Sequence, residues 1–68
     1  MRKANVELSV EFVRHTDKAI LVRYDASEVW LPKSQIEDEE EFDWDAFDED
    51  DDIDIIIPEW LAEEKGLW

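Results

Sequence analysis

The residues of this sequence that could carry chemistry are mostly carboxylates, and most of these fall in one stretch. Twelve of the sixteen residues from 37 to 52 (EDEEEFDWDAFDEDDD) are acidic, and Phe42, Trp44 and Phe47 are three of the other four. The whole chain has 21 acids and 7 bases, a net charge of -14, whereas outside the stretch nine acids face seven bases, a net of -2. A dense row of like charges repels itself and costs folding free energy. We therefore expect the stretch to serve a function.

These side chains are predicted to contact a partner. The predicted partner-binding residues are the acids and aromatics of the stretch, with Asp54 just after it: Glu37, Asp38, Glu39, Glu40, Glu41, Phe42, Asp43, Trp44, Asp45, Phe47, Asp48, Glu49, Asp50, Asp51, Asp52 and Asp54. Glu59, Glu63 and Glu64 would extend the acidic face. A fixed array of carboxylates can imitate the phosphates of a duplex, which carry one negative charge per roughly 1.7 Å of axis. The expected partner is a basic, nucleic-acid-binding protein surface.

The three aromatic residues bear on how the stretch is built. A solvated, disordered linker would explain the carboxylates, but it would not favour Phe42, Trp44 and Phe47. Two uses would explain them. They pack back on the sheet and hold the carboxylates in place, or they insert into an apolar groove of a partner, with Trp44 as the main anchor. The sequence leaves both uses open. Because the strand patterns lie outside 37–52, we also expect the sheet to form without this stretch.

A specific metal site is not expected. Acids stand at positions 1, 3, 5, 7 and 12 of an EF-hand loop, namely Asp48, Asp50, Asp52, Asp54 and Glu59. However, Ile53 stands at the position where the sharp turn of that loop needs Gly, and no helix pattern precedes it. We expect only loose, low-affinity binding of divalent ions.

Catalysis and cofactor binding have little support. Acid–base work by paired carboxylates needs a low-dielectric pocket that separates their pKa values, and a run of solvated acids supplies neither. His15, the only histidine, is predicted to lie in a turn, and the single Gly leaves no Gly-rich phosphate loop. We therefore predict no enzyme activity and no cofactor.

Composition narrows the location and the class of partner. The chain has no Cys, which fits a reducing cytoplasm. No apolar run approaches the roughly 20 residues that span a membrane, and the N-terminus lacks the apolar segment of a signal peptide. An acidic surface is repelled by anionic lipid and by nucleic acid. We expect a protein of the host-cell cytoplasm that binds neither membranes nor nucleic acid directly.

The rest of the sequence predicts the elements that must position the acidic stretch. Apolar and polar residues alternate with period two in several runs, which is typical of half-buried strands. The predicted strands are 6–12, 18–24, 28–31 and 53–57. The predicted fold is one α+β domain over 1–68: a small antiparallel β-meander or partly closed barrel of about four strands, with a short C-terminal helix. The acidic aromatic insert at 37–52 is a candidate flexible segment.

Local signals place a turn and the ends of the helix. Residues 33–36 predict a single helical turn that returns the last of them to the core. Pro58 suits the first turn of a helix, where its missing N–H does no harm, and Gly66 suits the C-terminal cap. A domain this small needs large apolar side chains in its core, so Trp30 and Trp60 are predicted to be buried.

Two fragments, VWLPKSQI at 29–36 and IPEWLAEEKGL at 57–67, resemble a group of small proteins encoded by phages, prophages and mobile elements. Such proteins look like a meander carrying the first string, a spacer, one more strand and the closing string. The resemblance covers most of the chain on both sides of the spacer and implies a mobile-element origin, but no settled activity. The spacer of this chain departs from it in being unusually long and acidic, and we take it as the site of function.

Two functional hypotheses follow. The first is a phage-derived inhibitor of the acidic DNA-mimic type, an anti-CRISPR or anti-restriction protein that blocks the DNA-binding surface of a host defence protein. The second is an interaction module whose acidic-aromatic segment docks in a groove on a host polymerase or regulator. Salt should weaken a phosphate mimic more steeply than a groove binder. We expect a monomer or a weak homodimer, since exposed strand edges could pair between copies.

Overall fold

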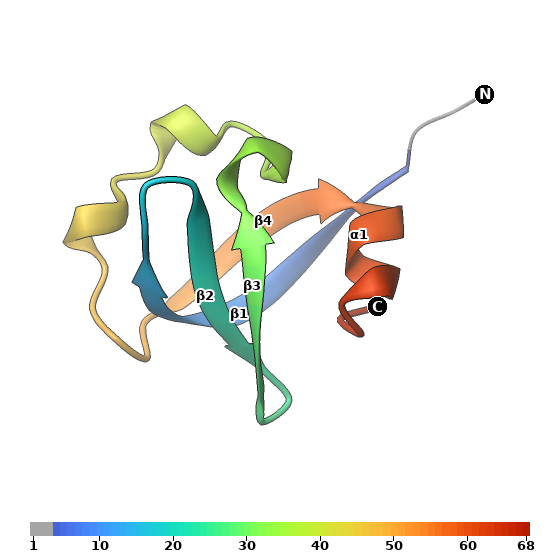
Figure 1. Ribbon diagram of the computed structural model, residues 1–68, viewed down its shortest axis with the longest axis horizontal. Coiled ribbons are helices and arrows are strands. Elements are labelled where there is room, and N and C mark those ends of the chain that lie inside the picture. The colour runs from blue at the N-terminus through green and yellow to red at the C-terminus, as the bar shows by residue number, and fades with distance from the viewer. Residues whose placement is uncertain (1–3) are drawn as a thin grey trace.

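Four antiparallel strands in the order β3-β2-β1-β4 form one sheet in the computed structural model, which describes residues 4–68 (Figure 1). The strands are β1 (Asn5–His15), β2 (Ala19–Tyr24), β3 (Ser27–Pro32) and β4 (Asp52–Pro58). Between β3 and β4 the chain makes three 3₁₀ turns, η1 (Lys33–Gln35), η2 (Glu39–Glu41) and η3 (Trp44–Ala46), and a short helix α1 (Glu59–Glu64) follows β4. The predicted α+β class is confirmed.

The first strand confirms the predicted alternation and extends it. Its buried residues are Val6, Leu8, Val10 and Phe12. The register with β2 then shifts at a β-bulge: Phe12 pairs with Val22, and the next pair is Arg14 with Leu21. The extra residue, Val13, allows β1 to run on to His15, which pairs with Ile20. The prediction that His15 lies in a turn was therefore wrong.

The β2–β3 hairpin has a two-residue loop. Tyr24 pairs with Ser27, and both loop residues lie in the left-handed region, Asp25 at φ 53° and Ala26 at φ 68°. Positive φ at both positions is the type I′ arrangement, whose twist matches that of the flanking strands. The turn is built without Gly, and this costs local free energy at Ala26 in particular.

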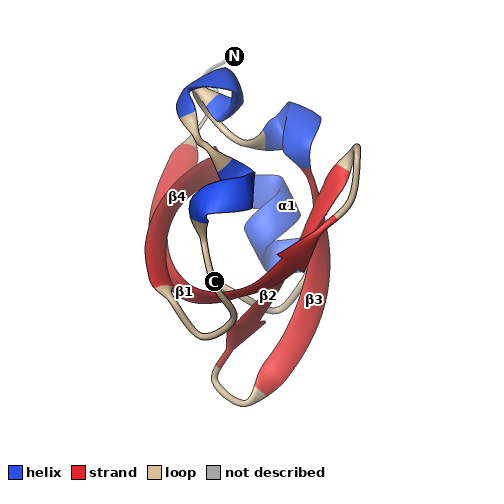
Figure 2. Ribbon diagram, turned by 90° about the vertical axis from the view of Figure 1, so that its left-hand side faces the viewer, coloured by secondary structure: helices blue, strands red, loops and turns tan. Residues whose placement is uncertain are grey.

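The sheet is open, so the prediction of a partly closed barrel was wrong. Strands β1 to β3 form the predicted meander, and β4 returns to the other side of β1, leaving β3 and β4 as the two edges. Within residues 4–68 no pairing joins those edges. The sheet is strongly curved, and its inner side is covered by other elements rather than by strand closure (Figure 2).

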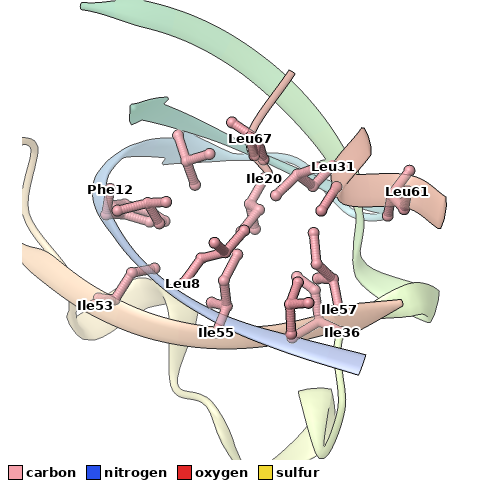
Figure 3. Close-up of a cluster of buried hydrophobic side chains, with 14 of the residues drawn as sticks. Leu8, Phe12, Ile20, Leu31, Ile36, Ile53, Ile55, Ile57, Leu61 and Leu67 are labelled. Atoms are coloured by element: carbon pink, nitrogen blue, oxygen red, sulfur yellow. The ribbon is translucent and has the colours of Figure 1, made fainter. Parts of the chain in front are cut away.

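The core lies on this inner side. Figure 3 shows side chains from the strands, among them Leu8, Ile20 and Ile55, meeting Leu61 of α1 and Leu67 beyond it. Ile36, directly after η1, is buried in the same cluster, as the predicted helical turn at 33–36 required.

Each end of α1 lies within one residue of its predicted position. Pro58 is the residue before its first turn, and Gly66 lies at φ 75° just after its last. The Gly66 N–H donates to the Glu63 carbonyl at 3.2 Å, and the Leu67 N–H donates to the Ala62 carbonyl at 2.8 Å. This pair of bonds is the Schellman motif, and it brings the buried Leu67 under the helix.

Two tryptophans predicted to be buried are exposed. Trp30 is 41% exposed because it pairs with Leu21 on the outer side of the sheet, whereas Leu31 takes the core position. Trp60 is 56% exposed, since the single buried stripe of α1 is filled by Leu61 and Ala62. No helix within residues 4–68 is long and apolar enough to cross a membrane.

Candidate partner-binding surface

The acidic stretch 37–52, called the insert below, is tied to the sheet by backbone hydrogen bonds at both ends. At its start the Glu37 N–H donates to the Ile56 carbonyl on the outer edge of β4 at 2.9 Å. At its end Phe12 of β1 accepts from the Asp50 N–H and donates to the Asp51 carbonyl, both at 2.7 Å. Between these points the insert passes over one end of the sheet (Figure 1).

An aromatic cluster holds the middle of the insert on the sheet. Trp44 is only 6% exposed and belongs to the core, and its ring stacks on Phe42 with centroids 4.7 Å apart and planes 13° from parallel. Phe12 of β1 lies 6.4 Å from the Trp44 ring and 5.5 Å from Phe47. Of the two uses that the sequence left open, the structure shows the first: the aromatics pack back on the sheet.

The carboxylates of the insert point the other way. Eleven of its twelve acids are exposed, and the twelfth, Glu39, is partly exposed and accepts a 3.4 Å hydrogen bond from the indole N–H of Trp44. Asp54, on the outer side of β4, is also exposed and accepts a 2.6 Å hydrogen bond from Ser9. The insert thus presents carboxylates outward on an apolar base.

A buried lysine and the only histidine link the insert to the first strand. Lys33 is 9% exposed, and its Nζ lies 3.0 Å from His15 Nδ1 and 5.7 Å from the centre of the Trp44 ring. An ammonium group only donates, so Nδ1 accepts and the Nε2–H donates to Asp45 Oδ1 at 2.9 Å. The two hydrogen bonds, from Lys33 to His15 and from His15 to Asp45, hold Asp45 in place. These contacts could not be predicted from the sequence, because the bulge at Val13 is what turns His15 inward.

Arg23 holds the C-terminal end of the insert. Its guanidinium donates to Asp50 at 2.7 Å and to Glu28 and Glu11 at 3.1 Å, and Glu49 lies 4.0 Å away. The hydrogen bond to Asp50, then those to Glu28 and Glu11, raise the pKa of the Arg23 guanidinium. Arg23 therefore joins β2 to its two neighbouring strands and to the insert.

Most carboxylates of the insert keep their charge uncompensated. Asp45 is hydrogen-bonded to His15, and Glu49 and Asp50 lie within 4.0 Å of Arg23, whereas the other nine have no basic side chain within that distance in residues 4–68. Since these nine are held near one another, they create a strong negative potential outside the protein. They are the most available charges for a cationic partner.

A groove runs beside the outer edge of β4. Its volume is about 340 Å³, and it is lined by five acids and two apolar side chains: Glu7, Glu37, Asp38, Glu41, Asp54, Phe42 and Ile56. Five of these residues were predicted partner contacts, whereas Glu7 and Ile56 were not. They are brought to the groove by the pairing of β1 with β4, which places Glu7 opposite Ile56.

The acids with EF-hand spacing are not gathered around one point. Asp52 and Asp54 lie along the extended strand β4, and Glu59 begins α1 after it. Within residues 4–68, no group of three or more His, Cys, Asp or Glu side chains is arranged to hold a metal ion.

Comparisons with protein-family models, with curated proteins and with solved structures gave no match to this chain. The function is therefore inferred from the arrangement of its own residues.

Proposed function

We propose that this protein is a phage-derived inhibitor that mimics nucleic acid and occupies the DNA-binding surface of a host defence protein. A CRISPR effector is the first candidate target and a restriction enzyme the second. The observation that carries the proposal is that one segment combines a buried aromatic cluster with nine carboxylates that have no ion-pair partner within residues 4–68. The protein acts in the host cytoplasm, without catalysis.

The buried aromatic cluster lowers the entropy cost of binding, because it fixes the carboxylates in place before a partner arrives. A disordered acidic chain would lose conformational entropy when its carboxylates were fixed on a partner, at about 1–2 kcal/mol per ordered backbone residue. Here Trp44 and the backbone hydrogen bonds of the insert supply that order before binding. Preorganised charge of one sign also steers an oppositely charged partner and raises the association rate.

The groove beside β4 suits an arginine or lysine of the target. The aliphatic stem of such a side chain would lie on Ile56 and Phe42, and its charged end would meet the surrounding carboxylates. DNA-binding surfaces present arginine and lysine side chains to the phosphates. A cationic surface built for a duplex therefore has the chemistry to bind here.

The second candidate is groove docking on a polymerase or regulator, and the burial of Trp44 makes it the weaker one. If Trp44 were the anchor, it would have to leave the core, and removing a buried Trp side chain from a core costs about 3–5 kcal/mol. Phe42 and Phe47, which are partly exposed, could contact a groove with a smaller rearrangement.

The test is competition with DNA. Purified defence nucleases, or their DNA-recognition subunits, would be titrated with labelled duplex in the presence of the protein, and bound DNA would be followed by fluorescence anisotropy across a salt series. The proposal expects displacement of DNA from at least one nuclease and a steep loss of affinity with salt. Binding to such a nuclease that left DNA in place, or that hardly changed with salt, would contradict mimicry and favour groove docking.

A further inference from the structure

We propose that the free edge of β3 pairs antiparallel with β3 of a second copy, so that two four-stranded sheets join into one. This inference concerns a different edge of the molecule from the acidic surface, and it does not depend on the proposed function. It rests on the unpaired backbone groups of Glu28 and Trp30, on the exposure of the Trp30 side chain, and on the local balance of charge.

The hairpin fixes which backbone groups of β3 are free. In an antiparallel pair, residues alternate between those that bond across the pair and those that turn their N–H and C=O away. The two-residue loop makes Tyr24 and Ser27 a bonded pair, so the even-numbered residues of β3, Glu28 and Trp30, turn their groups outward. Two facts agree with this: Pro32, which has no N–H, falls on the outward side, and the Lys33 N–H donates to the Lys18 carbonyl of the β2 side.

The edge at β3 is uncovered, whereas the edge at β4 is partly occupied. On β4 the insert reaches the strand, where Glu37 donates to the Ile56 carbonyl. On β3, no hydrogen bond within residues 4–68 engages the outward N–H or C=O of Glu28 or Trp30. The two edges lie on opposite sides of the sheet (Figure 2). An exposed strand edge with free donors and acceptors is a template for another strand.

Local charge makes β3 a better contact between two copies than β4. Glu28 is the one acid in β3, and it already forms an ion pair with Arg23 at 3.1 Å. The guanidinium of Arg14 lies 5.7 Å from the centre of the Trp30 ring. The β3 strand of a second copy therefore brings one acid and one apolar tryptophan to this edge, whereas β4 of a second copy would bring Asp52 and Asp54.

The edge is also complementary to itself. About a two-fold axis at Trp30, the two Trp30 residues exchange a pair of backbone hydrogen bonds, and each Glu28 N–H faces the Pro32 carbonyl of the second copy. In this register Glu28 lies opposite Pro32 and not opposite another acid, so no like charges face each other directly.

Salt should strengthen this association. Each copy has a net charge of -14, so two copies repel at long range, and added salt screens that repulsion. The contact itself is made by backbone hydrogen bonds and by Trp30, which depend less on salt. Salt therefore strengthens dimerisation, whereas it should weaken binding of the acidic surface to a basic target.

Sedimentation equilibrium at low and high salt, over a range of protein concentrations, tests the inference. The matched variants are Trp30→Lys at the edge and Trp60→Lys in α1, since both replace an exposed Trp by the same cation. We expect a dimer that tightens with salt in the wild type and in Trp60→Lys, and at least about tenfold weaker dimerisation in Trp30→Lys. A wild type that stays monomeric at every concentration and salt, or equal losses in both variants, would overturn the inference.

Amide hydrogen exchange of the wild type gives a readout that does not depend on how well a variant folds. Raising the protein concentration at high salt should slow exchange at Glu28 and Trp30 and leave Asp52 and Asp54 on the other edge unchanged. Slowed exchange at Asp52 and Asp54 alone would place the contact at β4 and contradict the inference. A wild-type monomer whose Trp30→Lys variant loses binding to a target nuclease would assign the edge to the target's strand, and would equally contradict it.

Discussion

Truncating Trp44 should remove much of the stability of the whole domain. Fully burying a large aromatic side chain takes about 150–250 Å² out of water, which at about 25 cal/mol per Å² is worth about 4–6 kcal/mol. Measured truncations of buried Phe and Trp cost about 3–5 kcal/mol. Because Trp44 is 6% exposed and stacks on Phe42, we expect Trp44→Ala to fall in that range. A chain of 68 residues has a total stability of about 3–10 kcal/mol, so this loss is a large share.

The control is Trp60→Ala, the same chemical change at a side chain that is 56% exposed. It should cost under about 1 kcal/mol, because most of that ring is already in water. The assay is thermal and urea unfolding followed by far-UV circular dichroism, which does not rely on the tryptophans that are changed. For a domain of this size each kcal/mol shifts Tm by about 4–8 °C, so Trp44→Ala should lower Tm by at least about 12 °C.

A Trp44→Ala protein as stable as Trp60→Ala would contradict a role for the Trp44 ring in the core. The aromatic base would then not hold the insert, and the sheet would fold without 37–52, as the sequence patterns alone suggested. The structure leads to the opposite expectation. When 37–52 is replaced by a Gly/Ser linker, the protein should no longer unfold cooperatively, because Phe12 would lose the rings packed against it.

Three further predictions concern the scaffold. Ala26→Gly should raise stability by about 0.5–1 kcal/mol in urea unfolding, because Ala26 lies at φ 68°, where Gly has no Cβ penalty; a loss of stability would contradict the type I′ turn. Gly66→Ala should lower stability by about 1 kcal/mol for the converse reason, since Gly66 lies at φ 75°, although a methyl group there would meet no neighbour; an unchanged urea midpoint would argue against the helix cap. Arg23→Gln leaves Glu11, Glu28 and Asp50 without their shared cation, so its stability, measured by thermal unfolding, should fall more at low salt than at high salt. An effect independent of salt would mean that Arg23 acts through packing.

The sheet could be predicted from the sequence because its signals are local. The period-two alternation of β1 and the Ile53, Ile55 and Ile57 positions of β4 are set by which side of a strand faces the core, and the structure buries these isoleucines. Pro58 and Gly66 likewise act through their own backbone angles. What the local signals lacked was the strand order: β4 pairs with β1, and within residues 4–68 no pairing joins β4 to β3, so the sheet is open.

The burial of the tryptophans could not be predicted from residue type. Trp44 stands among acids and is buried, whereas Trp30 and Trp60 stand in the apolar runs and are exposed. Which ring is covered depends on the path of the insert over Phe12 and on the single buried stripe of a six-residue helix. The link from Lys33 through His15 to Asp45 depends in turn on a one-residue bulge, which changes the side to which His15 points.

In the proposed function, the target recognises the carboxylates of the insert and not simply the overall negative charge of the protein. The measurement is inhibition of DNA binding by a nuclease that the wild type displaces, with two triple variants of equal charge. One variant carries Glu40→Gln, Glu41→Gln and Asp43→Asn in the insert, all exposed and without an ion-pair partner in residues 4–68. The matched control carries Asp17→Asn, Asp25→Asn and Glu28→Gln, exposed acids that were not predicted to contact the partner.

Each exposed ion pair is worth about 0.2–1 kcal/mol, so three lost pairs should weaken binding by about 0.6–3 kcal/mol, which is about 3- to 150-fold. We expect this loss, together with a shallower salt dependence, for the insert variant, and an unchanged affinity for the control. Equal losses in the two variants would show that net charge alone drives binding, and no loss in either would contradict the proposal that this surface mimics nucleic acid.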